Sequence, residues 1–475
     1  MTVLAIDQGT SGTKAIVVDP EEGVVGLAEV QVRPRYLNGG GVEQDPGELL
    51  ESVLGAGRAA VAQAGRPIDA VSLANQGETV LAWDPITGRA LTQAIVWQDR
   101  RAEDLCAALA EHGDMLAART GLVLDPYFSA PKMAWLRRNV ETGGVVTTSD
   151  TWLLHRLTGA FVTDATTASR SLVMELGARG WSHELLAVFG LEGERLPDIV
   201  GNDEMIGTTT EFGGDIPVGG VIVDQQAALL AEACLDPGMA KCTFGTGAFL
   251  LANTGATGVR SSAGLTSSVA WRIAGDDTFC VDGQVYTAAS AVRWLSSLGL
   301  IAGAEEMDGA AAQDNDGVLC VPALAGLAAP WWKSQATAAI SGMTLSTGRG
   351  HIVLAVLQGI AAQIAELVAA INADAPSRLS RLRADGGLTQ SKVLMQACAD
   401  ILQVPVDVYP SAHATALGGA ALAQLSLQPQ QSLRDVVSDW TPSASYEPTW
   451  TTDRTDEFRS TWRGLAATTY SQEAK

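Results

Sequence analysis

Three short segments of the chain carry the residue types that bind phosphate or move a proton. The first is the octapeptide Asp7-Gln8-Gly9-Thr10-Ser11-Gly12-Thr13-Lys14. Its glycines let backbone N–H groups face one point, and its hydroxyls and Lys14 add donors for phosphate oxygens. Asp7, at the end of an apolar run, is suited to hold Mg²⁺ directly or through water. An ordinary hairpin turn explains the octapeptide alone equally well.

The second segment is VGGVIVDQQAALLAEAC, in which Asp224 separates an apolar run from an Ala/Leu-rich stretch. The pattern predicts a strand over residues 218–223 that ends at Asp224, with a helix directly after it. A carboxylate at a strand end can accept the proton of an attacking hydroxyl. Taken alone, a helix cap is the simpler role for this aspartate.

The third segment, LRADGGLTQSKVLMQACADIL, places Asp385-Gly386-Gly387 before a predicted helix. Two glycines in a strand-to-helix turn let a flat ring or a phosphate approach the backbone closely. The same pair also occurs in such turns without any ligand.

The elements around the first two segments form one repeated pattern. TVLAIDQGTSGTKAIVVDP predicts strand, turn and strand, a third strand follows at VVGLAEVQV, and a helix covers residues 46–64. A strand pair surrounds Asn75, and a mostly helical region runs from about residue 99 to 191. A second strand–turn–strand, AKCTFGTGAFLLANTG, then echoes the first. We therefore predict two related α/β domains, residues 1–237 and 238–475, with a ligand cleft between them.

Composition narrows the class of partner. The 475-residue chain exceeds the size at which one hydrophobic core stops growing. Its formal net charge of −22 argues against nucleic acid, although backbone N–H groups and a metal ion can still hold a nucleotide. No secretion signal and no uninterrupted membrane-spanning apolar run are evident. The six scattered cysteines suit buried thiols in a reducing cytoplasm, and the five histidines lack metal-ligand spacing.

Taken in order, these segments resemble the FGGY family of carbohydrate kinases, and within it the glycerol kinases most closely. YFSAPKMAWLRRN, with Lys132 and Trp135 at the expected spacing, is similar to the first family signature. AAISGMTLSTGRGHIVLAVLQ is similar to the second. GVEQDPGE, AIVWQDRR, DTWLLHRLTG and DQQAALLAEACLDPGMAKCTFGTGAFLLANTG extend the resemblance over essentially the whole chain. It implies an α/β fold of two duplicated actin-like (ribonuclease H-like) domains that close over ATP and substrate.

The resemblance also implies a role for each candidate residue. Asp224 would be the base that deprotonates the attacking hydroxyl, and Asp7 would position Mg²⁺. The polyol would be bound by Gln76, Glu78, Trp97, Tyr127, Asp224, Gln225 and Phe249. The nucleotide and its phosphates would lie against Thr10, Ser11, Gly12, Lys14, Thr246, Gly247, Ala289, Arg293, Gly387, Leu388 and Ser391.

The main departure from the glycerol kinases is Gly77. In those enzymes this strand reads Asn-Gln-Arg-Glu-Thr, and the arginine donates to substrate hydroxyls, whereas here the strand reads Asn-Gln-Gly-Glu-Thr. Losing a charged donor would weaken glycerol binding by about ten- to a hundredfold. The change is expected to leave Glu78 without its neighbouring cation and to free space for water or a longer substrate. Val223, where glycerol kinases carry glycine, is a second departure.

Three functions follow as alternatives. The resemblance implies an ATP-dependent kinase that converts glycerol to glycerol 3-phosphate. Gly77 favours a kinase of another polyol or ketose, such as erythritol, a tetrulose or a pentulose, since erythritol kinases of the family are similar to this chain at Gln-Gly followed by an acid. A non-enzymatic sugar sensor on the same fold is the third. The intact Asp224-Gln225 pair argues against the sensor, which needs no base. Oligomerisation of the chain with itself is compatible with each alternative.

Overall fold

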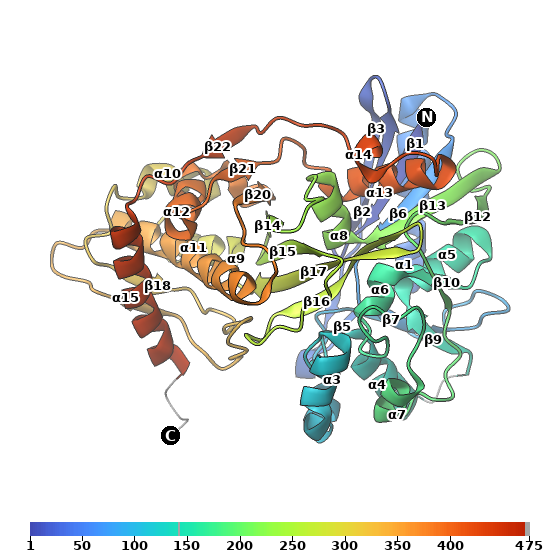
Figure 1. Cartoon of the computed structure of the whole chain (residues 1–475), viewed down its shortest axis with the longest axis horizontal. Coiled ribbons are helices and arrows are strands. Elements are labelled where there is room, and N and C mark those ends of the chain that lie inside the picture. Colours follow the sequence, from blue (N-terminus) through green and yellow to red (C-terminus); the bar gives the residue numbers. More distant parts are fainter. Residues whose placement is uncertain (141–142, 471–475) are drawn as a thin grey trace.

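Each half of the chain begins with an antiparallel hairpin that leads into a mixed sheet (Figure 1). The computed structural model describes residues 1–140 and 143–470. In the first half, β1 pairs antiparallel with β2 and parallel with β6, which in turn pairs parallel with β13. The sheet has the order β12-β13-β6-β1-β2-β3. Its strands are β1 (Val3–Gln8), β2 (Gly12–Asp19), β3 (Gly23–Gln31), β6 (Ala70–Asn75), β12 (Met205–Thr209) and β13 (Ile216–Val223).

The second half repeats this arrangement. Its hairpin strands β14 and β15 are antiparallel, β14 pairs parallel with β20, and β20 pairs parallel with β21. This repetition confirms the predicted α/β fold of two duplicated actin-like domains. The order is β16-β17-β15-β14-β20-β21-β22. The strands are β14 (Met239–Phe244), β15 (Ala248–Gly255), β16 (Thr266–Ile273), β17 (Asp276–Val285), β20 (Arg381–Asp385), β21 (Val406–Val408) and β22 (Ala444–Tyr446).

A smaller sheet and short helices extend the first half. The sheet has the order β4-β5-β8-β7-β9, and β9 lies inside the segment from about residue 99 to 191 that is predicted to be mostly helical. Its strands are β4 (Arg35–Tyr36), β5 (Val42–Gln44), β7 (Val80–Trp83), β8 (Ala94–Ile95) and β9 (Val145–Thr148). The helices are α2 (Glu103–Ala108), α3 (Gly113–Thr120), α4 (Ser129–Val140), α5 (Ser149–Thr158), α6 (Ala165–Ser169) and α7 (His183–Phe189), and β10 (Val162–Asp164) pairs with β11 (Asp198–Val200).

Local sequence sets the ends of α1 (Pro46–Ala64), which has the predicted bounds. The Asp45 side chain accepts hydrogen bonds from two backbone N–H groups of the first turn, and Pro46 needs no such partner. Gly65 ends the helix in the left-handed conformation, with φ of 62°.

Helix α13 (Ala414–Leu427) belongs to the second half of the sequence but packs on the sheet of the first, beside β1 and β6 (Figure 1). Glycine also permits α13 to approach α8 (Asp224–Ala231) closely, because a Cβ at Gly418 would lie 2.0 Å from the Ala227 carbonyl oxygen. The chain therefore returns to its first half near its end. The division between residues 237 and 238 stays a prediction.

The second half is built around α11 (Arg349–Asp374). This helix is long and apolar enough to span a bilayer, although the sequence shows no uninterrupted apolar run. However, 83% of its most apolar 18-residue stretch is buried inside the protein. It packs in the hydrophobic core with most of the buried residues of this half. All six cysteines are free and buried, as predicted. The other elements here are α9 (Ala289–Ser297), α10 (Met307–Ala310), β18 (Leu319–Val321), β19 (Ala339–Ser341), α12 (Lys392–Leu402), α14 (Leu433–Val436) and α15 (Thr452–Tyr470).

Candidate active site

The two hairpin turns face a common cleft of about 820 Å³. Thr10 and Ser11 line it from the first turn, and Thr246 and Gly247 line it from the second. A side chain at position 247 is excluded, because its Cβ would lie 2.4 Å from the Val285 carbonyl oxygen. The two segments of the weak internal repeat in the sequence thus form two turns that line one cleft. Both turns offer hydroxyls and backbone N–H groups, which can bind phosphate oxygens.

Aromatic rings connect this cleft to a smaller pocket. Trp97 donates from Nε1 to the Thr10 hydroxyl over 2.9 Å. Its ring centroid lies 5.5 Å from that of Tyr127 and 6.2 Å from that of Phe249, both edge-on. Tyr127 and Phe249 line both spaces. They therefore mark the passage from the hairpin turns to the inner pocket.

The inner pocket collects most of the predicted polyol residues. It measures about 20 Å³, and beyond it the space opens at the aromatic rings. Its walls hold two predicted carboxylates, one amide and two rings, together with residues that were not predicted. The lining is Glu78, Tyr127, Arg170, Val223, Asp224, Gln225, Gln226, Phe249, Leu251, Asp282 and Gly283.

The turn at Gly77 directs Glu78 into this pocket. Thr79 donates its backbone N–H to the Gly77 carbonyl oxygen over 2.8 Å, and Glu78 between them has a φ of 59°. This bond closes a γ-turn whose central residue is in a conformation that side-chain-bearing residues rarely adopt. Such strain persists where the surroundings hold it in place, commonly at functional sites.

The expectation that Glu78 lacks a cation is wrong. Arg170, which follows α6, donates from Nε to the Glu78 carboxylate, and both side chains are almost fully buried. Burial raises the pKa of Glu78, and the positive charge of Arg170 opposes that rise. The carboxylate is thus paired with an arginine that lies 92 positions away in the sequence.

The expectation of free space beside Gly77 is also wrong. A Cβ at position 77 would lie 3.3 Å from Cγ1 of Val223, which is tighter than an ordinary contact. Val223 is itself 2% exposed. The two departures from the glycerol kinase pattern are therefore neighbours in space, and the valine side chain occupies the room next to the glycine.

Asp224 is the first residue of α8 and projects into the inner pocket. Val223, rather than Asp224, is the capping residue, and the one hydrogen bond that the Asp224 carboxylate accepts within residues 1–140 and 143–470 comes from the adjacent Gln225 N–H, over 2.6 Å. Burial and the charge of Glu78 raise the pKa of Asp224 to about 6, while Lys241 opposes the shift. A carboxylate with a raised pKa beside a small pocket is well suited to act as a base.

Gln225 is held by a buried lysine that was not predicted. Lys241 of β14, with no exposed surface, donates from Nζ to Gln225 Oε1 and to the Thr243 hydroxyl, each over 2.6 Å. Because the carbonyl oxygen of the Gln225 amide is engaged, its NH₂ group remains to donate toward the pocket.

Gln76 lies behind the pocket and does not line it. Its Nε2 donates to Gln44 Oε1 over 2.7 Å, and Gln44 Nε2 donates to the Thr10 carbonyl oxygen over 2.6 Å. This chain of amides connects β6 to the first hairpin turn. The structure thus shows Gln76 supporting the turn, and direct contact with substrate stays a prediction.

The candidate nucleotide residues fall into two groups. Arg293 of α9 lines the cleft with the hairpin residues, and Ala289 donates its backbone N–H to the Gly245 carbonyl oxygen over 3.0 Å. Lys14 reaches the Ala412 carbonyl oxygen over 3.3 Å, just before α13. Ala289 and Lys14 do not line the cleft, and neither do the remaining candidates: Gly12 begins β2, Gly387 and Leu388 follow β20, and Ser391 caps α12.

Asp7 fits a magnesium ion that is held mainly by water and phosphates. No group of three or more potential metal-ligating His, Cys, Asp or Glu side chains occurs within residues 1–140 and 143–470. Mg²⁺ in kinases commonly takes only one or two carboxylates, and the remaining ligands are water and substrate phosphates. Burial and the charge of Asp224 raise the pKa of Asp7 to about 7, and a cation bound beside Asp7 would favour its ionised form.

Sequence reasoning missed Arg170, Asp282 and Lys241. The residues next to each of them in the sequence are mostly apolar or small. The signal that could have identified them was a single charged residue within a predicted core element. That signal identifies a buried charge but not its partner. The partners come from other elements, and spacing along the chain does not show them.

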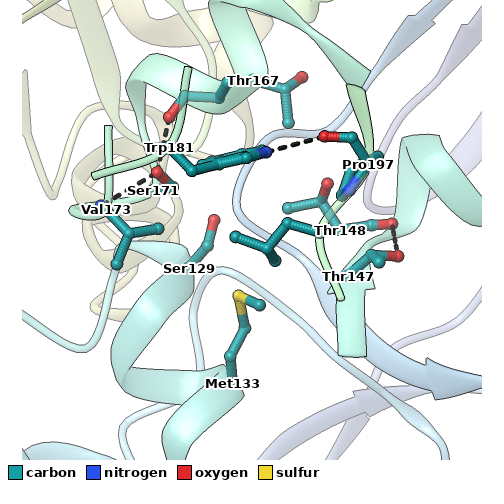
Figure 2. A pocket seen from close by; sticks show the side chains of 11 residues that line it. Ser129, Met133, Thr147, Thr148, Thr167, Ser171, Val173, Trp181 and Pro197 are labelled. Carbon is teal, nitrogen blue, oxygen red and sulfur yellow. Dashed lines mark hydrogen bonds between the residues drawn. The ribbon is translucent and has the colours of Figure 1, made fainter. Parts of the chain in front are cut away.

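An enclosed space under α4 is not a substrate site. Figure 2 shows Ser129 and Met133 on one side of it and Trp181 on the other, with the indole donating to the Pro197 carbonyl oxygen over 2.8 Å. Its volume is about 10 Å³, which is enough for about one water molecule. The Ser129 hydroxyl is buried without a partner among the described residues, as a water-binding group would be.

Comparison with known proteins agrees with this geometry. Residues 2–231 match the N-terminal domain, and residues 240–427 the C-terminal domain, of the FGGY family of carbohydrate kinases. The glycerol kinases of Bordetella parapertussis and Thermus brockianus are each 42% identical; both alignments cover 97% of this chain, and 96% and 97% of the respective relative. The crystal structure of Plasmodium falciparum glycerol kinase with ADP is 33% identical, with a TM-score of 0.93 and 98% of both chains covered. The chain belongs to the FGGY family of carbohydrate kinases.

Proposed function

We propose that the protein transfers the terminal phosphoryl group of ATP to a terminal hydroxyl of glycerol, which yields glycerol 3-phosphate and ADP. The observation that carries this is the position of Asp224, which lies in a small polar pocket that opens past Tyr127 and Phe249 onto the two hairpin turns. Full-length similarity to proteins named glycerol kinase supports the same assignment.

In this proposal the polyol lies with its hydroxyls toward the carboxylates and its C–H groups toward the rings. Asp224 aligns the reacting hydroxyl and takes its proton as the new oxygen–phosphorus bond forms. Glu78 accepts from a second hydroxyl, and the Gln225 amide donates. The aromatic edges of Trp97, Tyr127 and Phe249 exclude water from the C–H side.

The hairpin turns are proposed to hold the phosphates. Thr10 and Ser11 approach from one domain and Thr246 and Gly247 from the other, so the transferring group would lie between hydroxyls and backbone N–H groups. Asp7 would hold Mg²⁺, which neutralises phosphate charge when bound. Arg293 and the turn at Gly387 would border the nucleotide. The free cysteines and the small-molecule substrate fit an enzyme of the cytoplasm.

The packing of Val223 favours glycerol over a longer substrate. Gly77 is the observation that favours a tetritol or ketose, but the room beside it is filled by the valine, and the inner pocket is small. The deciding measurement is ADP release with ATP and Mg²⁺ on glycerol, erythritol, threitol, erythrulose, xylulose and ribulose. Preference for a four- or five-carbon substrate would overturn the glycerol assignment, and inactivity on all of them would favour the sensor.

Val223→Ala is expected to shift the preference toward erythritol. Removing two methyl groups opens the space beside Gly77, so kcat/KM for erythritol relative to glycerol should rise about tenfold, whereas the free energy of unfolding should fall by about 1–3 kcal/mol. Val218→Ala, in the same strand and equally buried, is the matched control, and it should lose stability without changing the ratio. An unchanged ratio in Val223→Ala would show that this side chain does not limit substrate length.

The rate should depend on ionisation of Asp224. Because its pKa is raised to about 6 and the base must be deprotonated, kcat/KM for glycerol should be constant above that pH. Below it, kcat/KM should fall by about tenfold per pH unit. The profile is measured at saturating Mg²⁺, which keeps Asp7 ionised. A rate that stays constant down to the ordinary pKa of an aspartate, about 4, would contradict the role of Asp224.

A further inference from the structure

Arg170 is the single cation among the described residues that line the inner pocket. The pocket also contains the carboxylates of Glu78, Asp224 and Asp282. Ionised carboxylates only accept hydrogen bonds, whereas a polyol hydroxyl both donates and accepts. A pocket with this lining therefore needs donors, and the residue at position 77 has no side chain to supply one.

The guanidinium of Arg170 has more N–H donors than it uses in hydrogen bonds to the described protein residues. It carries five N–H bonds. Nε donates to Glu78, Nη1 donates to Asp282 Oδ1 over 3.0 Å, and Nη2 makes a long contact of 3.5 Å with the Tyr127 hydroxyl. Two N–H bonds thus have no protein acceptor within residues 1–140 and 143–470. A charged donor in a buried site binds a hydroxyl more strongly than a neutral donor does.

The orientation of the guanidinium is set from several sides. Its Cζ lies 5.6 Å from the ring centroids of both Tyr127 and Phe128, so the planar group rests on aromatic faces. The Arg170 side chain is 7% exposed and that of Asp282 is 17% exposed. A guanidinium held in this way loses little further freedom when it binds a ligand.

The contact with Asp282 joins the two halves of the chain. Arg170 and Glu78 belong to the first half, and Asp282 lies on β17 of the second. The pocket is therefore completed by a charge from the opposite domain. Separation of the halves would release one edge of the guanidinium.

We propose that Arg170 is a substrate-binding and specificity-determining residue, which donates to a polyol hydroxyl in place of a side chain at position 77. Asp282 holds Arg170 in position from the opposite domain. The proposal rests on the polyol kinase function above. The donor arrives from the end of α6, while the carbonyl group of Gly77 closes the tight turn that directs Glu78. The polyol is bound through the Glu78–Arg170 pair as one donor–acceptor unit.

The test begins with Arg170→Lys, which keeps the charge but removes the planar fork. KM for glycerol should rise about ten- to a hundredfold, as expected for a lost charge-assisted hydrogen bond, while KM for ATP stays within about twofold. Arg272→Lys is the matched control: Arg272 is a similarly buried arginine that donates to Asp277 over 2.6 Å, outside the pocket. It should leave both KM values unchanged.

Chemical rescue separates binding from a purely structural role. Arg170→Ala should regain part of its kcat/KM for glycerol when guanidinium ion is added below denaturing concentrations, whereas Glu78→Gln should not. Asp282→Asn, which preserves side-chain volume, should raise KM for glycerol by about three- to tenfold. This second variant keeps the test decisive if replacements of Arg170 do not fold.

The possible results are distinct. An unchanged KM for glycerol in Arg170→Lys would overturn the proposal, and the Glu78–Arg170 pair would then have only a structural role. If Arg170→Lys does not fold, an unchanged KM for glycerol in Asp282→Asn would overturn the proposal in the same way. Inactivity of the unaltered protein on every polyol and ketose would instead refute the proposed function itself. In that case, binding without turnover is measured as the protection that glycerol gives against thermal unfolding, in the unaltered protein and in Arg170→Lys. Equal protection of the two proteins would overturn the proposal.

Discussion

Asp224→Asn should lower kcat for glycerol phosphorylation by about 10²–10⁴-fold, the usual contribution of a positioned base. The amide has nearly the same shape as the carboxylate but cannot accept the proton of the attacking hydroxyl. Nucleotide binding should persist, because the hairpin turns that line the cleft are unaltered. The measurement pairs steady-state ADP release with the shift in unfolding temperature on addition of ATP and Mg²⁺.

Asp150→Asn is the matched control for this replacement. Asp150 is fully buried, accepts from the Thr163 hydroxyl over 2.6 Å, and has a pKa that burial raises to about 6, as for Asp224. It lies outside both the inner pocket and the cleft. Its variant should retain kcat. A value of kcat within tenfold of the unaltered protein for Asp224→Asn would refute its role as base.

Lys132→Met should lower the free energy of unfolding by about 3–5 kcal/mol, since it leaves several buried acceptors unsatisfied. Lys132 is 1% exposed, and its ammonium donates to three consecutive carbonyl oxygens, those of Pro126, Tyr127 and Phe128, over 2.5–2.7 Å. These carbonyls belong to the segment that carries Tyr127 to the pocket. Methionine has a similar length but provides no donor.

The effect is measured by denaturant unfolding and by KM for glycerol. A loosened segment would displace Tyr127, so KM for glycerol should rise along with the loss of stability. Lys333→Met, at an exposed lysine, should change the free energy of unfolding by less than about 0.5 kcal/mol. Equal stability of Lys132→Met and the unaltered protein would show that water replaces the ammonium without cost.

Local pattern was sufficient for the elements that carry the site. The apolar runs that flank Gly9-Thr10-Ser11-Gly12 and Gly245-Thr246-Gly247 predicted both hairpins, and the structure forms β1–β2 and β14–β15 there. The bounds of α1 follow from Asp45 and Gly65, which act within one or two turns of the helix. Such signals are readable because the residues that interact are close along the chain.

Gly77 is a position at which prediction from neighbouring residues alone is wrong. The missing side chain predicts an unpaired Glu78 and an enlarged pocket when only neighbouring residues are considered. The structure fills the space with Val223 and pairs the carboxylate with Arg170, so the pocket is small and Glu78 has a cationic partner. The glycine is better understood as part of the tight turn that directs Glu78 than as a loss.

The sequence alone thus determined two duplicated α/β domains, their hairpin turns, and a carboxylate at the end of the strand before α8. Only the tertiary structure decided what surrounds that carboxylate. Arg170 contacts residues 92 and 112 positions away, Lys241 joins the second domain to Gln225, and α13 returns to the first sheet. A buried charge must find a partner wherever the fold brings one close, and distance along the chain does not limit that choice.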